Sequence, residues 1–243
     1  MGLKESGLRG SLRSVSTGVA DIPDTVVDNF NDDDDSPPGV YGPEQGLLDF
    51  YTERGSGSFS RESGDAIVGN TALSVISGTS DDILFSGSGD GLNRYPQKGD
   101  VLSCFIRDGT ENRVFAGYFY GAEFTNDDLS GYYARIDISG DEVQLLRKDG
   151  GSFSSLGSAS VSLVGGQFYD LEVAWHDGTG SESDNTHIVT IYEVENGGRG
   201  SELESFTATD STYSDNVGIG FRDGSGGTAD PMADDYRVIG DVE

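Results

Sequence analysis

The chain has 243 residues, of which 43 are aspartate or glutamate and 15 are lysine or arginine, so its formal net charge is -28. A folded domain with this charge repels itself in dilute salt, whereas molar salt shortens the screening length to about 3 Å. The acid excess therefore favours a protein that folds in concentrated brine, with an acidic calcium-rich extracellular protein or a disordered acidic chain as alternatives. Aromatic residues make up 10% of the sequence, which disfavours disorder, and the scattered arginines form no basic stripe, which excludes nucleic acid as a partner.

The first element in chain order is an N-terminal arm, residues 1–24. Its first 20 residues carry three basic side chains and one acidic side chain, unlike the acidic remainder. The spacing of Leu8, Leu12 and Val15 fits one face of a short helix that is too short to be stable alone. We expect the arm to dock on a neighbouring acidic subunit, with packing on its own domain as the alternative. The expected docking residues are Leu3, Lys4, Leu8, Arg9, Leu12, Arg13 and Val15.

A connector follows the arm, and a short first strand around Val26 and Val27 lies within it. From residue 47 onward, short apolar runs alternate with turns rich in glycine, aspartate and asparagine. The predicted strands are 47–51, 66–68, 72–76, 83–85, 101–107, 114–120, 132–138, 143–147, 160–164, 168–176, 188–194, 203–208, 217–221 and 236–239. No segment after the arm has a convincing helical period.

Strict alternation is clearest over residues 168–175, where Tyr169, Leu171, Val173 and Trp175 are expected on one face of the strand. Many short strands without helices predict an all-β fold, a two-sheet antiparallel sandwich spanning residues 25–243. Cys104, the single cysteine, lies in an apolar run and is expected to be buried and inert.

Five segments carry a resemblance to a known fold family. In chain order they are GYYARIDISGDEVQLLRKDGG, LVGGQFYDLEVAWHDG, HIVTIYEVENG, SELESFTATDSTYSDNVGIGFR and ADDYRVIG. With them, the stretch 99–240 resembles the concanavalin A-like (LamG-like) lectin and glucanase jelly roll, and VVDNFND resembles the opening strand of that family. The resemblance covers most of the chain and implies a fold rather than an activity.

The opening segment GLKESGLRGSLRSVSTGVADIPDTVVDNF resembles the start of proteins from haloarchaea and their tailed viruses. That resemblance implies a virion component, assembled in the host cytoplasm, whose arm attaches a surface domain to other virion proteins and to copies of itself. The N-terminus has no apolar stretch of the length expected for a secretory signal, and no window approaches a membrane span.

Carboxylate pairs are the first candidates for chemistry, because glycoside hydrolysis uses two carboxyl groups. The resemblance implies three acids at i, i+2 and i+4 on one strand for a glucanase, and this chain has only pairs. The pairs are Asp170/Glu172, Glu193/Glu195 and Glu202/Glu204. Such pairs arise by chance in a chain this acidic, so we expect no catalytic residues and no enzyme.

Metal sites are the second candidates. The family resemblance implies a structural calcium between the first and last strands, where Asp28, Asn29, Asp234 and Asp235 match in order, with solvated surface charge as the alternative. The two histidines, His176 and His187, do not make a zinc site by themselves.

Glycan binding is the third candidate, because aromatic rings can serve as platforms for sugars. Tyr118, Tyr120, Tyr132 and Tyr133 are dense enough to form one, with burial between the sheets as the alternative.

The sequence as a whole predicts a non-enzymatic structural or surface protein of a haloarchaeal virus particle, a capsid decoration or tail component that also contacts host glycans. A carbohydrate-binding module is the first alternative, and a jelly-roll glycoside hydrolase is the second.

Overall fold

The computed structural model describes residues 25–28, 30, 50–55, 58–63, 66–68, 71–77, 83–90, 92, 94–107, 115–125, 128–223 and 230–241. All structural statements below refer to these residues. These residues form fifteen strands. Among them there is no helix that is long and apolar enough to cross a membrane.

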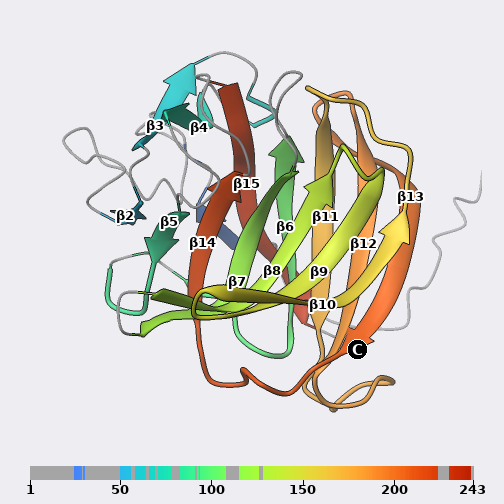
Figure 1. Cartoon of the computed structure of the whole chain (residues 1–243). Coiled ribbons are helices and arrows are strands. Elements are labelled where there is room, and N and C mark those ends of the chain that lie inside the picture. The colour runs from blue at the N-terminus through green and yellow to red at the C-terminus, as the bar shows by residue number, and fades with distance from the viewer. Residues whose placement is uncertain are drawn as a thin grey trace, which may run out of the picture.

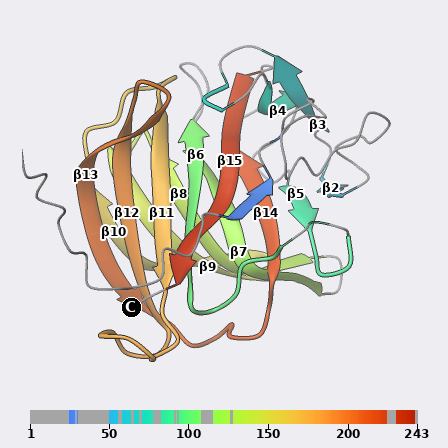
Figure 2. The same cartoon turned by 180° about the vertical axis from the view of Figure 1, so that it is seen from behind.

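The strands form two sheets that face each other (Figures 1 and 2). Within each sheet, every assigned strand pair is antiparallel. The eight-stranded sheet runs in the order β13 (Gly198–Thr209), β12 (Thr186–Glu195), β11 (Phe168–Trp175), β6 (Asp100–Arg107), β15 (Asp230–Asp241), β4 (Thr71–Ser77) and β3 (Ser58–Ser63), and β1 (Thr25–Asp28) pairs with β15. The seven-stranded sheet runs β10 (Ser152–Ser160), β9 (Glu142–Asp149), β8 (Asp128–Asp137), β7 (Phe115–Thr125), β14 (Gly218–Asp223), β5 (Ile83–Ser86) and β2 (Thr52–Arg54).

This architecture confirms the predicted all-β, two-sheet antiparallel sandwich of the concanavalin-like type. Some predicted strands are wrong in detail. Residues 66–68 form no strand, and Tyr51 precedes β2 instead of ending a strand. The prediction of a strand over 160–164 is also wrong, because Ser160 ends β10, a strand that the sequence analysis did not predict.

The core between the sheets is rich in aromatic side chains. The predicted inward face of β11 is confirmed, since Leu171, Val173 and Trp175 are all fully buried and belong to this core. Trp175 lies edge-on to Tyr120 and Tyr132 of the other sheet, with ring centroids 5.5 and 5.8 Å away. Rings of this size bury a large apolar area each.

The buried tyrosines also carry hydroxyl groups that need partners, and these partners lie across the sandwich. Tyr118 of β7 donates to the carbonyl oxygen of Leu171 on β11 at 3.1 Å. The Tyr120 hydroxyl is 2.8 Å from His187 Nδ1 on β12. Tyr132 of β8 donates to the carbonyl oxygen of Asp210, which follows β13, at 2.9 Å. These bonds therefore join the seven-stranded sheet to the eight-stranded side of the sandwich.

A second apolar cluster covers the opposite, outer face of the seven-stranded sheet. Along β7 and β8, side chains alternate between the two faces, so Phe119 and Tyr133 lie outside while Tyr118 and Tyr132 lie inside. The rings of Phe119 and Tyr133 stack with centroids 4.4 Å apart. A solvated sheet face is normally polar, so this apolar outer face sets the seven-stranded sheet apart.

The expected burial of Cys104 is confirmed: the side chain is fully buried, its thiol is unpaired, and Sγ lies 3.4 Å from the carbonyl oxygen of Asp234. Burial raises the pKa of this thiol well above its ordinary value, which makes the reactive thiolate scarce.

Replacement of Gly117 tests the close pairing of β7 with β8. A Cβ atom at this position would lie 2.1 Å from the carbonyl oxygen of Ala134, so Gly117→Ala must push two paired backbones apart. We expect a loss of about 1–3 kcal/mol in the free energy of unfolding, measured by denaturant titration at constant salt. Gly198→Ala is the matched control, because a Cβ there meets nothing within 4 Å. Equal stabilities of the two variants would contradict the packing described here.

Candidate functional site

A cavity of about 300 Å³ lies on the outer face of the seven-stranded sheet. Every strand of that sheet contributes to its lining. β2 contributes Arg54, β5 contributes Ile83 and β7 contributes Phe124. β8 contributes Asp128 and Leu129, β9 contributes Lys148, β10 contributes Phe153 and β14 contributes Arg222.

The lining shows that the sheet is strongly curved. Since β2 and β10 are the two edge strands of the sheet and still line one cavity, the sheet curls and its outer face is concave. Figure 1 shows the bend along β7, β8 and β9. We call this feature the concave-face cavity.

Arginine side chains rest on aromatic rings at the concave-face cavity. The guanidinium carbon of Arg222 lies 4.7 Å from the ring centroid of Phe153 and 4.8 Å from that of Phe115. The guanidinium carbon of Arg54, on the edge strand β2 of the same sheet, lies 4.7 Å from the ring centroid of Phe124. A cation over an aromatic face is attracted electrostatically by the ring, which favours this arrangement of the two side chains.

Lys148 of β9 links β8 and β9 at the base of the cavity. Its ammonium group donates to Asp128 Oδ1 at 2.5 Å, to the carbonyl oxygen of Leu129 at 3.1 Å and to the carbonyl oxygen of Gly150. An ammonium group has three protons to donate, and these three acceptors match them. The side chain of Lys148 is 8% exposed and that of Asp128 is 41% exposed. The ion pair therefore leaves part of the Asp128 carboxylate accessible from the cavity.

The candidate carboxylate pairs of a glycoside hydrolase lie elsewhere. All three pairs belong to β11, β12 and β13 of the eight-stranded sheet. Among the described residues that line the concave-face cavity, Asp128 is the single carboxylate. The lining thus offers rings, cations and one hydrogen-bond acceptor, which suits binding more than the two-carboxylate chemistry of glycoside hydrolysis.

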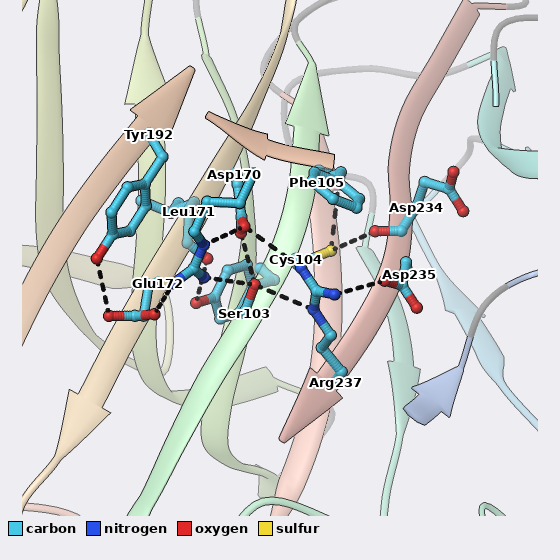
Figure 3. A network of polar contacts seen from close by, with 12 residues as sticks. Ser103, Cys104, Phe105, Asp170, Leu171, Glu172, Tyr192, Asp234, Asp235 and Arg237 are labelled. Carbon is cyan, nitrogen blue, oxygen red and sulfur yellow. Dashed lines mark hydrogen bonds and ion pairs between the residues drawn. The ribbon is translucent and has the colours of Figure 1, made fainter. Parts of the chain in front are cut away.

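The pair Asp170 and Glu172 takes part in an ion-pair network on the outer face of the eight-stranded sheet (Figure 3). Asp170 is fully buried, and it accepts hydrogen bonds from the Ser103 hydroxyl at 2.5 Å, from Arg199 Nε at 2.7 Å and from Arg237 Nη2 at 3.3 Å. Arg199 also pairs with Glu172 at 2.5 Å. A buried carboxylate needs such partners to offset its lost hydration, so these contacts give Asp170 a structural role.

The residues of the expected calcium site bind protein donors. Asp28 Oδ1 accepts from the amide of Phe30 at 2.8 Å, and Asp28 Oδ2 accepts from the Tyr51 hydroxyl at 2.7 Å. Asp235 pairs with Arg237 at 3.2 Å.

Asp234 is likewise used by the protein, because its Oδ2 accepts from the amides of Ile67 and Val68 at 2.6 and 2.8 Å. Burial raises the pKa of Asp234 to about 7, against the effect of these two hydrogen bonds. Asn29 lies outside the described residues. Within the described part of the chain, no group of three or more histidine, cysteine or acidic side chains converges on a metal position.

The four tyrosines of the expected glycan platform require a correction. Tyr118, Tyr120, Tyr132 and Tyr133 are all 0% exposed, so none of their rings is available to a sugar. The first three pack between the sheets. Tyr133 lies on the concave face beneath neighbouring rings, and its hydroxyl donates to the carbonyl oxygen of Arg222 at 3.0 Å. The alternative, burial between the sheets, therefore describes Tyr118, Tyr120 and Tyr132, while Tyr133 is buried on the concave face.

The half-buried rings on the concave face are Phe115, Phe124 and Phe153, which the sequence analysis did not single out. A signal for this face was present in β7, where Phe115 and Phe119 alternate with Tyr118 and Tyr120, so both faces of the strand are aromatic. The residues of the expected docking arm, Leu3, Lys4, Leu8, Arg9, Leu12, Arg13 and Val15, lie outside the described residues.

Comparison with known proteins yields distant structural neighbours. No protein-family model matches the chain, and no curated protein matches it at a significant level. A carbohydrate-binding module, CBM66, from Bacillus subtilis is 15% identical, with a TM-score of 0.48 over 76% of this chain and 91% of that one.

Two further neighbours are a glycoside hydrolase family 16 endo-glucanase and a phage module. The endo-glucanase, from Bacteroides ovatus, is 12% identical, with a TM-score of 0.47 over 87% of this chain and 96% of that one. The CBM2 module of the evolved Dit of Lactobacillus casei BL23 phage J-1 is 11% identical, with a TM-score of 0.46 over 84% and 94% of the two chains. At these identities and TM-scores, none of the three neighbours carries an argument about function.

His187 has a packing role. Its ring is fully buried between the sheets, stacked 6.0 Å from Trp175, with Nδ1 facing Tyr120 and Nε2 facing the carbonyl oxygen of Asp210. Burial lowers the pKa of His187 to about 4, mainly because the charged ring would lose its hydration.

The pKa of His187 generates a pH prediction. Because it lies below the ordinary value near 6.5, the folded protein binds fewer protons than the unfolded chain between those two pH values. The stability that neutral His187 contributes is complete above pH 6.5 and is lost as the pH falls toward about 4. We expect His187→Gln to flatten the pH dependence of the unfolding free energy in this interval by up to about 1.4 kcal/mol per pH unit. Thr190→Val, also on β12, keeps the histidine and should keep the wild-type slope; equal slopes for wild type and His187→Gln would contradict the assignment.

Proposed function

We propose that the protein binds glycans in the concave-face cavity and acts as a carbohydrate-binding module. The observation that carries this proposal is the composition of the cavity, whose lining brings the half-buried rings of Phe124 and Phe153 together with cationic side chains and one carboxylate on one face of the sheet. Sugars present an apolar C–H face and a rim of hydroxyl groups. The rings of Phe124 and Phe153 can stack against such a face, while Asp128, Arg54 and Arg222 offer hydrogen-bond partners for the rim.

The cavity is also held in shape before any ligand enters. Lys148 ties β8, β9 and the following turn together, and Arg222 is fixed over the rings of Phe115 and Phe153. A site with ordered side chains loses less conformational entropy on binding. This arrangement supports binding to a short saccharide unit rather than to an extended flat surface.

The role in a haloarchaeal virus particle stays a prediction from the sequence. It depends on the arm, residues 1–24, which lies outside the described residues. A glycan-binding surface domain is compatible with that role, because such a domain would contact the glycosylated surface of a host.

Removal of one ring of the cavity tests the proposed function. Phe153→Ala deletes a ring that is half-buried on the concave face, and we expect about tenfold weaker binding to any saccharide that the wild type retains on an immobilised glycan panel, followed by calorimetry with the same saccharide. The matched control is Tyr192→Ala, which deletes a ring paired with Arg199 at 4.1 Å on the outer face of the other sheet.

The control variant should bind like the wild type. If Tyr192→Ala loses affinity and Phe153→Ala does not, the glycan site lies on the eight-stranded sheet instead. If the folded wild type binds no member of a panel of neutral and acidic saccharides, the proposed function is wrong.

A further inference from the structure

We infer that the glycan site is a groove of three consecutive cavities and that its ligand is an oligosaccharide of at least three units. This inference rests on the proposed function, which assigns one saccharide unit to the concave-face cavity, and it defines the size of the ligand. It starts from two further cavities, of about 370 and 340 Å³. Each is larger than the concave-face cavity, so each has room for a saccharide unit as well.

Shared side chains join the three cavities in a row. Phe124 lines both the concave-face cavity and the cavity of 370 Å³, which we call the second cavity. Ser88 and Val217 line both the second cavity and the cavity of 340 Å³, which we call the third cavity. No described side chain lines both the concave-face cavity and the third cavity. A saccharide that extends past Phe124 therefore enters the second cavity before it reaches the third.

The second cavity lies at the strand ends of the seven-stranded sheet, where β5 and β7 end and β14 begins. Its apolar wall contains the ring of Phe124, packed edge-on to Phe85 with centroids 4.3 Å apart. Its polar groups include the side chains of Ser88, Glu123 and Asn216, which together donate and accept hydrogen bonds. Asn216 Nδ2 is buried without a hydrogen-bond partner, and a ligand oxygen that bonded to it would recover the cost of burying that donor.

The third cavity also combines a ring with polar groups. Tyr95 supplies a half-buried ring, and its hydroxyl lies 2.9 Å from that of Ser86. Arg94 pairs with Asp100 at 2.5 Å, and the backbone amide of Gln97 donates to the same carboxylate at 2.7 Å. Asp100 is 4% exposed and begins β6, so these bonds anchor the cavity wall to the sandwich. The side chain of Gln97 is exposed.

The turn between the second and third cavities is ordered as well. The Gly87 amide donates to Asp90 Oδ2 at 2.8 Å, and the Asp90 amide donates to the carbonyl oxygen of Gly87 at 3.0 Å. Ser88, which lines both cavities, belongs to this turn. Walls that are ordered before binding lower the entropy cost of each added contact. Every cavity in the row thus offers a ring and polar groups in a fixed arrangement, and each further sugar unit gains contacts until all three cavities are filled.

A series of ligand lengths tests this inference with the full-length protein at constant salt. The probes are gluco-, manno- and galacturono-oligosaccharides of one to six units, and calorimetry measures the dissociation constant of each. In the series that binds, we expect the trisaccharide to bind about tenfold more tightly than the monosaccharide, because it fills two more cavities. Equal affinity for one and for three units would overturn the inference.

Two variants connect the length dependence to the groove. Ser88 is exposed and lines the second and third cavities, so Ser88→Leu takes up space in both without altering the core. We expect it to weaken trisaccharide binding about tenfold and to leave monosaccharide binding unchanged. Gln97→Ala removes an exposed side chain from the third cavity and should weaken trisaccharide binding several-fold. Ser201→Leu, at an exposed position of β13 in the other sheet, is the matched control and should bind every length like the wild type.

The outcomes distinguish this inference from the proposed function. Phe153→Ala changes the concave-face cavity and should weaken binding of every length, whereas Ser88→Leu should weaken only the longer members. If Ser88→Leu and Gln97→Ala both bind the trisaccharide as tightly as the wild type, the three-cavity groove is wrong and glycan binding in the concave-face cavity stands. Binding of no saccharide at all, under conditions where the domain is folded, would count against both proposals.

Discussion

The structure depends on tyrosine residues that are buried between two sheets and hydrogen-bonded across the gap. A tyrosine ring in a core adds apolar area, but its hydroxyl group costs free energy if it finds no partner. Tyr118, Tyr120 and Tyr132 all project from the seven-stranded sheet, and their hydroxyls bond to β11, to β12 and to the segment after β13. The two sheets must keep the separation that these bonds require. Because inward and outward side chains alternate, the same three tyrosines fix which residues of β7 and β8 reach the outer face.

The two outer faces of the sandwich differ in what their arginines contact. On the eight-stranded sheet, Arg199 and Arg237 both pair with the buried Asp170. On the seven-stranded sheet, Arg54 and Arg222 rest on aromatic rings beside a cavity. With so few cations in the chain, the placement of each one matters. Arg199 and Arg237 pair with a buried carboxylate, whereas Arg54 and Arg222 lie against rings on the concave face.

The sequence predicts the strands that have one apolar and one polar face, because alternation is then visible in the residues themselves. The inward face of β11 is a clear example. It does not reveal β10, whose sequence SFSSLGSAS is mostly polar and whose strand conformation depends on pairing with β9. The prediction of an exposed tyrosine platform was wrong for a related reason. The number of tyrosines in a segment does not tell which face of a strand carries the rings.

The cavity itself could not be predicted from local patterns. Its side chains come from seven strands, and Arg54 belongs to a three-residue strand that the sequence analysis did not identify. Their meeting depends on the curvature of the sheet, which joins residues from both of its edges. Curvature follows from the packing of the whole sandwich rather than from any single segment. The sequence therefore supports the fold class well and the location of the candidate site poorly.

The edges of the sheets have a further consequence. β10 and β13 end their respective sheets on the same side of the molecule, and Gly157 of β10 packs closely against Phe206 of β13. β13 is twelve residues long and carries Glu202 and Glu204 exposed. An edge strand offers free backbone groups that can recruit another chain into a continuous sheet. Two copies meeting along β13 would bring like charges together, so fibre growth along this edge is opposed in dilute solution and is opposed least in the concentrated salt that the composition favours.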